Sequence, residues 1–192
     1  MPFYVIYNLK SCNPFGGAAM RQEHILRLLH HVAKHDTEAF LELYTEFSPL
    51  VFSIALSILK NTHDANDTVQ DVFIKIFGVS AENIPTSNPI GWIYSIAKNK
   101  ALENYKKIKR EYHTNIDDID FISYNQAIEE PADIISILSC LSPEEAQIVI
   151  LKVVYRFTHK EISQLLHLPQ GTVQWKYKTA LNKIKKSMPN EG

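Results

Sequence analysis

Six basic side chains lie within residues 98–110, a segment that contains a single acid, Glu103. Lysine and arginine at this density suit the phosphates of nucleic acid, an anionic membrane surface or an acidic protein surface. The residues just before this segment are apolar at helical spacing: Trp92, Ile93, Ile96 and Ala97. We therefore expect one helix whose apolar end packs into a core and whose basic end binds an anionic partner.

Residue types suited to catalysis or metal binding are sparse. His31 and His35 are four residues apart and could share a helix face with His24, a spacing that zinc sites use. No cysteine or carboxylate completes the set, and Leu28 lies on the same face, which favours a solvated face over a metal site. The sequence has no glycine-rich phosphate loop and no nucleophile elbow. We expect no enzyme activity, no metal and no cofactor.

The 192 residues carry a net charge of −1, and 45% of them are hydrophobic, which is enough for a folded core. No apolar run approaches the roughly 20 residues that cross a bilayer, so we expect no membrane insertion. Cys12 and Cys140 have no ligand-like spacing, and the cytoplasm is the expected location. The charge alternates in blocks that indicate separate surfaces for different partners. These blocks are acidic at 36–71, basic at 98–110, acidic at 111–145 and basic from 146 onward.

The first nineteen residues differ in composition from the rest of the chain. Their apolar run is short and lacks the basic leader of a secretory signal. Met20, in contrast, opens a helical pattern almost at once. We interpret 1–19 as an N-terminal extension that is either disordered or precedes a natural start at Met20.

Nearly all periodicity in the chain is helical, and the fold class that we expect is all-α. Asp36 or Thr37 caps one helix. Pro49 starts the next one, in a first turn where its missing N–H costs nothing, and Asp64 caps a third. Residues 78–90 contain two prolines and form a loop before the basic helix.

Further helix starts are expected in the C-terminal part of the chain. Ser142 and Thr158 each begin a capping box with a glutamate three residues later, and Thr172 caps the last helix. The acidic stretch that precedes these helices reads as a linker. We place two small helical domains at 20–111 and 139–192, and the linker at 112–138.

The last two helices have the layout of a helix-turn-helix that reads DNA. Polar side chains at the start of the second helix would face base edges, and lysines further along would meet phosphates. A plain helical hairpin with a solvated basic face fits the same pattern. The candidate DNA contacts are Thr172, Gln174, Trp175, Lys176, Lys178, Thr179 and Lys183, with Lys185 and Lys186 suited to phosphates.

Residues 141–186 resemble the fourth-region domain of extracytoplasmic-function (ECF) sigma factors, with its L-x-P start, E-I-A helix and x-P-x-G-T-V turn. The matching positions are Leu141, Pro143, Glu161, Ile162, Leu165, Pro169, Gly171, Thr172, Val173 and Ala180. The resemblance implies a domain that reads the −35 promoter element and contacts the β flap of RNA polymerase. The chain departs from the family at Ser163, His167, Lys176 and Thr179, where small alanine, glycine and two arginines are usual. Lysine cannot form the bidentate fork of arginine to guanine, so the base contacts do not carry over directly.

Residues 35–59, followed by 64–77, resemble the helices of the second-region domain of the same family, whose pattern in the second segment approximates D-A-E-D-x-x-Q-E-x-F. Asp64, Ala65, Asp67, Gln70 and Phe73 agree, and Asp71 keeps the charge of the usual glutamate. The resemblance implies a polar face that docks on the β′ clamp helices of the polymerase core. Its candidate residues are Asn66, Asp67, Gln70 and Asp71.

The basic helix falls where this family has its promoter-melting helix, with the pattern W-L-x-x-I-A-R-N, and residues 78–90 fall where it has a recognition loop for the −10 element. The resemblance implies that an unstacked base is held near this loop. A membrane-surface role would explain the basic helix alone but leaves the C-terminal motif unexplained. The candidate −10 contacts are Asn83, Ser87, Asn88, Trp92, Lys98, Asn99, Lys106, Lys107 and Arg110.

Together the two resemblances predict an alternative sigma factor that binds RNA polymerase core and directs promoter recognition, −10 melting and initiation. Its expected partners are the core and promoter DNA, and many members of the family also have an anti-sigma protein. One alternative is a helix-turn-helix regulator that binds duplex DNA without polymerase. Another is a degenerate sigma-like interaction protein. Only the first of these readings needs the acidic face of residues 64–77.

Overall fold

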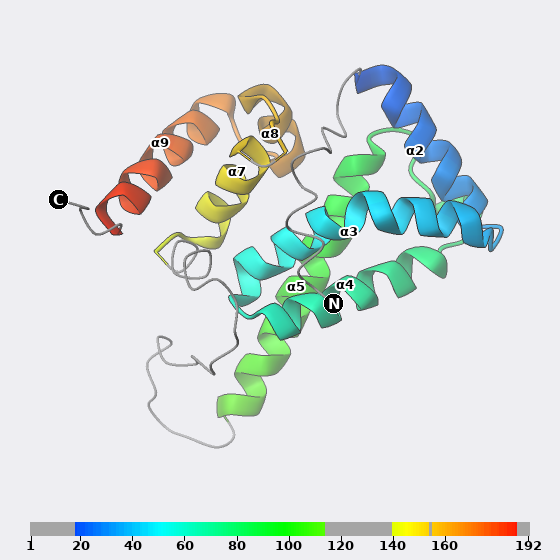
Figure 1. Cartoon of the computed structure of the whole chain (residues 1–192), viewed down its shortest axis with the longest axis horizontal. Helices are drawn as coiled ribbons and strands as arrows, with labels where there is room; N and C mark the ends of the chain where they lie inside the picture. The colour runs from blue at the N-terminus through cyan, green and yellow to red at the C-terminus, as the bar shows by residue number, and fades with distance from the viewer. Residues whose placement is uncertain (1–17, 114–139, 154, 188–192) are drawn as a thin grey trace.

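The structure, a computed structural model, describes residues 18–113, 140–153 and 155–187 (Figure 1). These residues form α-helices joined by short loops, with one 3-10 turn and no strand within the described ranges, so the predicted all-α fold class is confirmed. The N-terminal helices are α2 (Ala18–Val32), α3 (Thr37–Leu59), α4 (Thr62–Phe77), the 3-10 helix η2 (Ala81–Asn83) and α5 (Pro89–His113). The C-terminal helices are α7 (Pro143–Val153), α8 (His159–Leu166) and α9 (Gln170–Ser187).

Helix α3 is the centre of the fold. It packs against α2, α4 and α5 and also against α7 from the C-terminal part of the chain. Among the described helices, α3 is the one long and apolar enough to cross a membrane by length and composition alone. Residues that point in several directions from it, such as Leu43, Val51 and Ile54, are at most 2% exposed. The apolar side chains of α3 are therefore buried by the neighbouring helices, as in the core helix of a folded domain.

Helix α3 runs unbroken through Pro49, so the prediction that a new helix starts at Pro49 is wrong. A proline inside a helix removes one backbone hydrogen bond and costs about 3 kcal/mol or more. Its neighbours Phe47, Leu50 and Val51 are each at most 1% exposed. Burying a side chain of this kind contributes about 1.5–3 kcal/mol. The packing on both sides of Pro49 thus outweighs the lost hydrogen bond.

Three of the predicted helix caps are confirmed. The Asp36 carboxylate accepts hydrogen bonds from the backbone N–H groups of Glu38 and Ala39, at 3.0 and 3.1 Å. Thr158 begins a complete capping box at the start of α8. At Ser142, the backbone N–H donates to the Glu145 carboxylate at 2.9 Å, and the Glu145 N–H donates to the Ser142 hydroxyl at 3.3 Å.

Two of the predicted helix starts are displaced. Helix α4 begins at Thr62 because the Asn61 side chain caps it, accepting the N–H of Asp64 at 3.1 Å. Asp64 therefore lies inside the first turn and does not cap the helix. Helix α9 begins at Gln170, two residues before the predicted cap Thr172.

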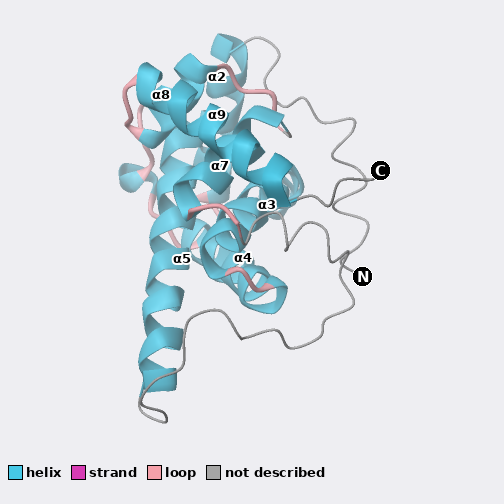
Figure 2. Cartoon of the chain, turned by 90° about the vertical axis from the view of Figure 1, so that its left-hand side faces the viewer, coloured by secondary structure: helices cyan, strands magenta, loops and turns pink. Residues whose placement is uncertain are grey.

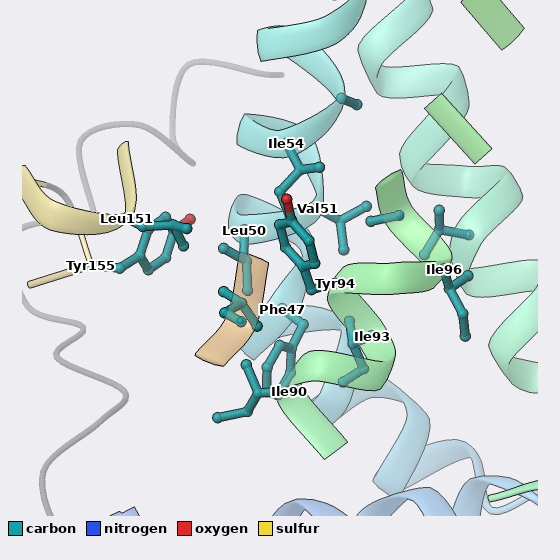
Figure 3. Packing of buried hydrophobic residues seen from close by; sticks show 14 of the residues in the cluster. Phe47, Leu50, Val51, Ile54, Ile90, Ile93, Tyr94, Ile96, Leu151 and Tyr155 are labelled. Carbon is teal, nitrogen blue, oxygen red and sulfur yellow. The ribbon is translucent and has the colours of Figure 1, made fainter. Parts of the chain in front are cut away.

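The C-terminal helices lie against the N-terminal bundle. Helix α7 contacts α3, and α8 contacts α5. Figure 3 shows Leu151 and Tyr155 facing Leu50 of α3, and all three residues belong to one cluster of buried hydrophobic side chains. The predicted N-terminal extension and linker lie largely outside the described residues, and the predicted domain limits remain predictions.

Candidate nucleic-acid interface

The outer face of α4 carries the polar residues that the sequence assigned to a protein partner. Asn66, Asp67 and Gln70 are exposed, while Val72 and Phe73 on the opposite face are at most 2% exposed. Asp67 also lies 3.3 Å from the Nδ1 atom of His63, one turn earlier. The face is therefore acidic, accessible and held in place by the core beneath it.

Asp71 differs from the other three residues of this set. Its carboxylate lies 3.4 Å from the ammonium of Lys100, and it accepts a 3.5 Å hydrogen bond from the Asn104 amide. The same amide donates to the Thr68 hydroxyl at 2.9 Å. Asp71 thus braces α4 against α5, and its charge is partly neutralised within the chain.

Sequence reasoning missed Ile74, which is 70% exposed and follows Gln70 by one helical turn. An isoleucine in the polar register of an amphipathic helix was the signal that could have identified it. The outer face of α4 therefore combines carboxylate and amide groups with one large apolar side chain.

The loop before α5 presents three of the predicted −10 contacts. Asn83, Ser87 and Asn88 are all exposed. The Asn83 amide donates to the Ser80 hydroxyl at 2.8 Å. The Asn88 side chain accepts the N–H of Gly91 at 3.1 Å, which caps the start of α5. Asn88 adopts a left-handed backbone with φ of 50°, so it has a structural role in this loop.

Gly91 lies directly against the Asn88 side chain. A Cβ atom added there would lie 2.3 Å from the Asn88 amide nitrogen, so the Asn88 side chain that caps the helix would have to move. The loop before α5 and the basic helix are therefore joined by a tight connection at Asn88 and Gly91.

Helix α5 has the two ends that the sequence predicts. Ile93 and Ala97 are fully buried and Trp92 packs against the core, whereas the last turns of the helix extend beyond the rest of the molecule (Figure 2). Asn99, Lys106, Lys107 and Arg110 are exposed on this helix, and Lys98 is half-buried.

Spacing along α5 places one set of predicted contacts in a row. Trp92, Asn99 and Lys106 follow one another at intervals of seven residues, and Arg110 comes four residues after Lys106. These side chains therefore share one helix face. A row of this kind can follow a nucleic-acid backbone from the core outward.

The turn between α8 and α9 is formed by two of the residues that depart from the family pattern. His167 ends α8 with a left-handed backbone, φ 54°, where a glycine would be free of strain. The Ser163 hydroxyl donates a 2.6 Å hydrogen bond to the Leu168 carbonyl across the turn. Ser163 thus secures the turn, and an alanine at this position could not.

Helix α9 is anchored by Val173 and Ala180, both fully buried. Of the predicted contacts on this helix, Trp175 is 64% exposed, Gln174 and Lys178 are also exposed, and Thr172 and Thr179 are half-buried. Asn182, which sequence reasoning did not select, is exposed and lies seven residues after Trp175 on the same face. The outward face of α9 therefore offers an aromatic ring, amides and lysines, the groups that read bases and hold phosphates.

The two remaining predicted contacts on α9 form ion pairs with the first turn of α7. The Lys176 ammonium lies 2.7 Å from the Glu144 carboxylate. The Lys183 ammonium donates to both carboxylate oxygens of Glu145, at 2.9 and 2.8 Å. Burial raises the pKa of Glu145, but hydrogen bonds from Lys183 and Ser142 outweigh that effect, and the net pKa is lowered. Glu145 is therefore ionised at neutral pH.

The described residues contain no group of three or more histidines, cysteines or carboxylates that could hold a metal ion. The histidines that the sequence analysis considered have other neighbours: His24 and His31 of α2 lie beside carboxylates, and His35, in the turn after α2, lies beside the ring of Phe77 of α4. His24 lies 3.0 Å from Glu42, and His31 lies 3.1 Å from Asp36.

Comparisons with known proteins bear on both halves of this interface. Residues 43–111 match the family model for sigma-70 region 2, and residues 132–184 match the model for sigma-70 region 4. The ECF RNA polymerase sigma factor SigW of Bacillus subtilis is 22% identical over 181 residues, which cover 85% of this chain and 96% of SigW. SigK of Mycobacterium bovis is 22% identical over 169 residues, covering 82% and 90% of the two chains.

Two solved structures share the fold of this chain. The sigma factor RpoE of Bartonella quintana, solved in complex with the anti-sigma factor NepR, gives a TM-score of 0.60 at 20% identity, covering 82% of this chain and 99% of RpoE. CnrH, solved with the cytosolic domain of CnrY, gives 0.59 at 19% identity, covering 84% and 94%. The two region models match in the family's order, and the curated relatives match over nearly their whole lengths. The chain therefore belongs to the sigma-70 family and is a sigma factor of the extracytoplasmic-function type.

Proposed function

We propose that this sigma factor brings RNA polymerase core to a promoter through three surfaces on one chain. The observation that carries the proposal is that an acidic face on α4, a basic extension of α5 and an exposed face of α9 occur on a single scaffold. The α4 face, with Asn66, Asp67 and Gln70, would dock on the β′ clamp helices of the core. Asp71, through its contacts with Lys100 and Asn104 of α5, would hold this face in position.

The −10 element would meet the loop before α5 and the row along that helix. Unstacking a duplex costs about 1.4 kcal/mol per step, and each base that stacks on protein returns about 1–3 kcal/mol. Phosphate contacts from Lys106, Lys107 and Arg110 would add affinity that falls with salt. A few captured bases and neutralised phosphates are then sufficient to favour melting without ATP.

The −35 element would meet α9, with the β flap of the core nearby. Trp175, Gln174 and Lys178 are exposed and would enter the major groove, and the exposed Asn182 would extend the same face. Amide side chains read adenine in this groove, and an aromatic ring can contact the thymine methyl group.

Simultaneous contact with both elements requires the two halves of the chain to separate. Sites about 25 base pairs apart lie roughly 85 Å apart along B-DNA. In the structure, however, α7 lies directly on α3. Residues 114–139, which connect the two halves, span at most roughly 90 Å when fully extended. The covalent length of the chain therefore permits a promoter-bound form in which this contact is broken.

The remaining parts of the proposal follow from what the relatives are. RpoE was solved with the anti-sigma factor NepR, and CnrH with the cytosolic domain of CnrY. We propose that an anti-sigma protein likewise binds this chain and that the chain works in the cytoplasm without catalysing a reaction.

Run-off transcription tests the proposal. Bacterial core polymerase is incubated with fragments of genomic DNA, with and without the full chain, and the transcripts are mapped. Discrete transcripts that need the chain support the proposal. If no transcript depends on the chain while it still binds duplex DNA, the helix-turn-helix regulator is the better account.

A further inference from the structure

Two flanks of the recognition helix α9 carry lysines with different surroundings. Lys176 and Lys183 are seven residues apart and lie on the flank that faces the first turn of α7. Lys178, Lys185 and Lys186 are exposed on the remaining surface of the helix. The ion pairs to α7 therefore neutralise part of the positive charge of α9 in the DNA-free chain.

The two ion pairs are not equivalent. The Glu145 side chain is 7% exposed and also closes the capping box at Ser142, so its pair with Lys183 is part of the packing of the domain. The Glu144 side chain is 41% exposed and forms its ion pair with Lys176, whose side chain is 23% exposed. Ion pairs at exposed positions are weak, typically about 0–1 kcal/mol, and can be exchanged for another anion.

We propose that Glu144 competes with DNA phosphate for Lys176 and thereby sets how strongly the recognition helix binds duplex DNA. The proposal rests on the proposed function, because it assumes that α9 meets DNA. Lysine has a flexible stem and a point charge without fixed geometry, so it can turn from a carboxylate to a phosphate. Glu144 thus acts as a specificity-determining residue, because it weakens phosphate binding while leaving the base-reading face of α9 unchanged.

Binding of the full chain to a fluorescently labelled 30-base-pair duplex of arbitrary sequence tests this inference. Anisotropy titrations between 50 and 200 mM salt give both affinity and salt slope. Glu144→Gln frees Lys176 for one more phosphate. We expect duplex affinity to rise about fivefold and the salt slope to steepen by about 0.9.

Glu161→Gln is the matched control. It removes the same charge from the same part of the chain, but Glu161 pairs with Thr158 at the start of α8 instead of a lysine, and glutamine preserves a capping box. General electrostatics alone would make the two variants bind alike. Lys176→Gln, alone and combined with Glu144→Gln, completes a double-mutant cycle.

The Glu144→Gln variant should bind duplex DNA more tightly and with a steeper salt slope than the Glu161→Gln variant. Adding Lys176→Gln should abolish both differences. Equal behaviour of the two glutamate variants, or an excess that persists without Lys176, overturns it. Circular dichroism melting curves check that each variant is folded, and Glu144→Ser serves as a second variant if Glu144→Gln is unstable. Because the assay contains no polymerase, this result is independent of core binding.

Discussion

The hydroxyl of Tyr94 in α5 donates a 2.5 Å hydrogen bond to the Oε1 atom of Gln147 in α7. Tyr94 is 2% exposed and Gln147 is 3% exposed, so the bond is shielded from water. Burial, with the charge of Glu144 in addition, raises the pKa of the Tyr94 hydroxyl, which keeps it a neutral donor. This polar contact joins the region 2 match to the region 4 match. It is surrounded by the apolar residues of α3 that Figure 3 shows beside Tyr94.

Tyr94→Phe removes this bond and leaves the Gln147 oxygen buried without its donor. We expect the free energy of unfolding to fall by about 1–3 kcal/mol, the cost of an unsatisfied buried polar group. Urea denaturation followed by circular dichroism measures the change. Tyr44→Phe is the matched control, because Tyr44 is 37% exposed and should change stability little. Equal stability of the two variants would show that the Tyr94 bond does not hold the halves together.

Lys60 gives a pH-dependent prediction at the same contact. Its ammonium donates to the Leu141 carbonyl at 3.5 Å. Burial lowers the pKa of Lys60 from 10.5 to about 8, and the nearby Cys140 opposes that shift in part. Between pH 8 and pH 10.5 the unfolded chain therefore binds more protons than the folded one, so this residue makes stability rise with pH in that window.

Lys60→Gln should remove that rise. Urea unfolding at pH 7, 8, 9 and 10 is compared for the wild type and the variant, with Cys140→Ser in both backgrounds to eliminate titration of the thiol. The difference in free energy of unfolding between the two proteins should be constant below pH 8. Above pH 8 it should shift in favour of the wild type. Parallel pH profiles throughout would rule out a depressed pKa at Lys60.

His167 offers a stabilising substitution. Its left-handed backbone is costly for any residue with a Cβ atom, and the side chain is exposed. His167→Gly should raise the free energy of unfolding by about 1 kcal/mol, measured by urea denaturation. Gln164→Gly, at an exposed position within α8, should instead lower it by about 1 kcal/mol. A loss of stability at both positions would mean that the His167 side chain contributes contacts that outweigh the strain.

Lys106 and Lys107 test the role of the α5 extension. Replacing both with glutamine should reduce promoter opening by the complex of this chain with core polymerase. The reactivity of unpaired thymines toward permanganate measures the opening. The salt slope of promoter binding should become shallower by about 1.4–1.8, for two lost phosphate contacts. Lys34→Gln with Lys75→Gln removes the same charge from exposed sites outside α5, one in the turn after α2 and one on α4. An unchanged slope in the Lys106/Lys107 variant contradicts a backbone-binding role.

Local signals in the sequence identified much of the fold. The caps at Asp36, Ser142 and Thr158 were predicted because a helix N-terminus is satisfied by residues within three positions of it. Pro49 was misread because its cost is local, whereas the burial that offsets it comes from distant helices. The helix propensity of a short segment does not include the burial that distant helices provide.

The candidate site was predicted less completely, for a similar reason. Periodicity and the family pattern located the exposed faces of α4, α5 and α9. They did not reveal that Asp71 pairs with Lys100, or that Lys176 and Lys183 pair with Glu144 and Glu145. These pairs join helices that are far apart in sequence, and they decide which charges remain available to a partner.

Core binding by the outer face of α4 tests the central claim most directly. Purified bacterial core polymerase is titrated with the fluorescently labelled full chain. We predict tight binding by the wild type and loss of binding by the Asp67→Ala, Gln70→Ala double variant, with the fold intact by circular dichroism. Gln22→Ala with Glu23→Ala likewise removes one amide and one carboxylate, at exposed positions of α2, and should bind like the wild type. Unchanged core affinity in the α4 variant, or no core binding by the wild type, would contradict the account.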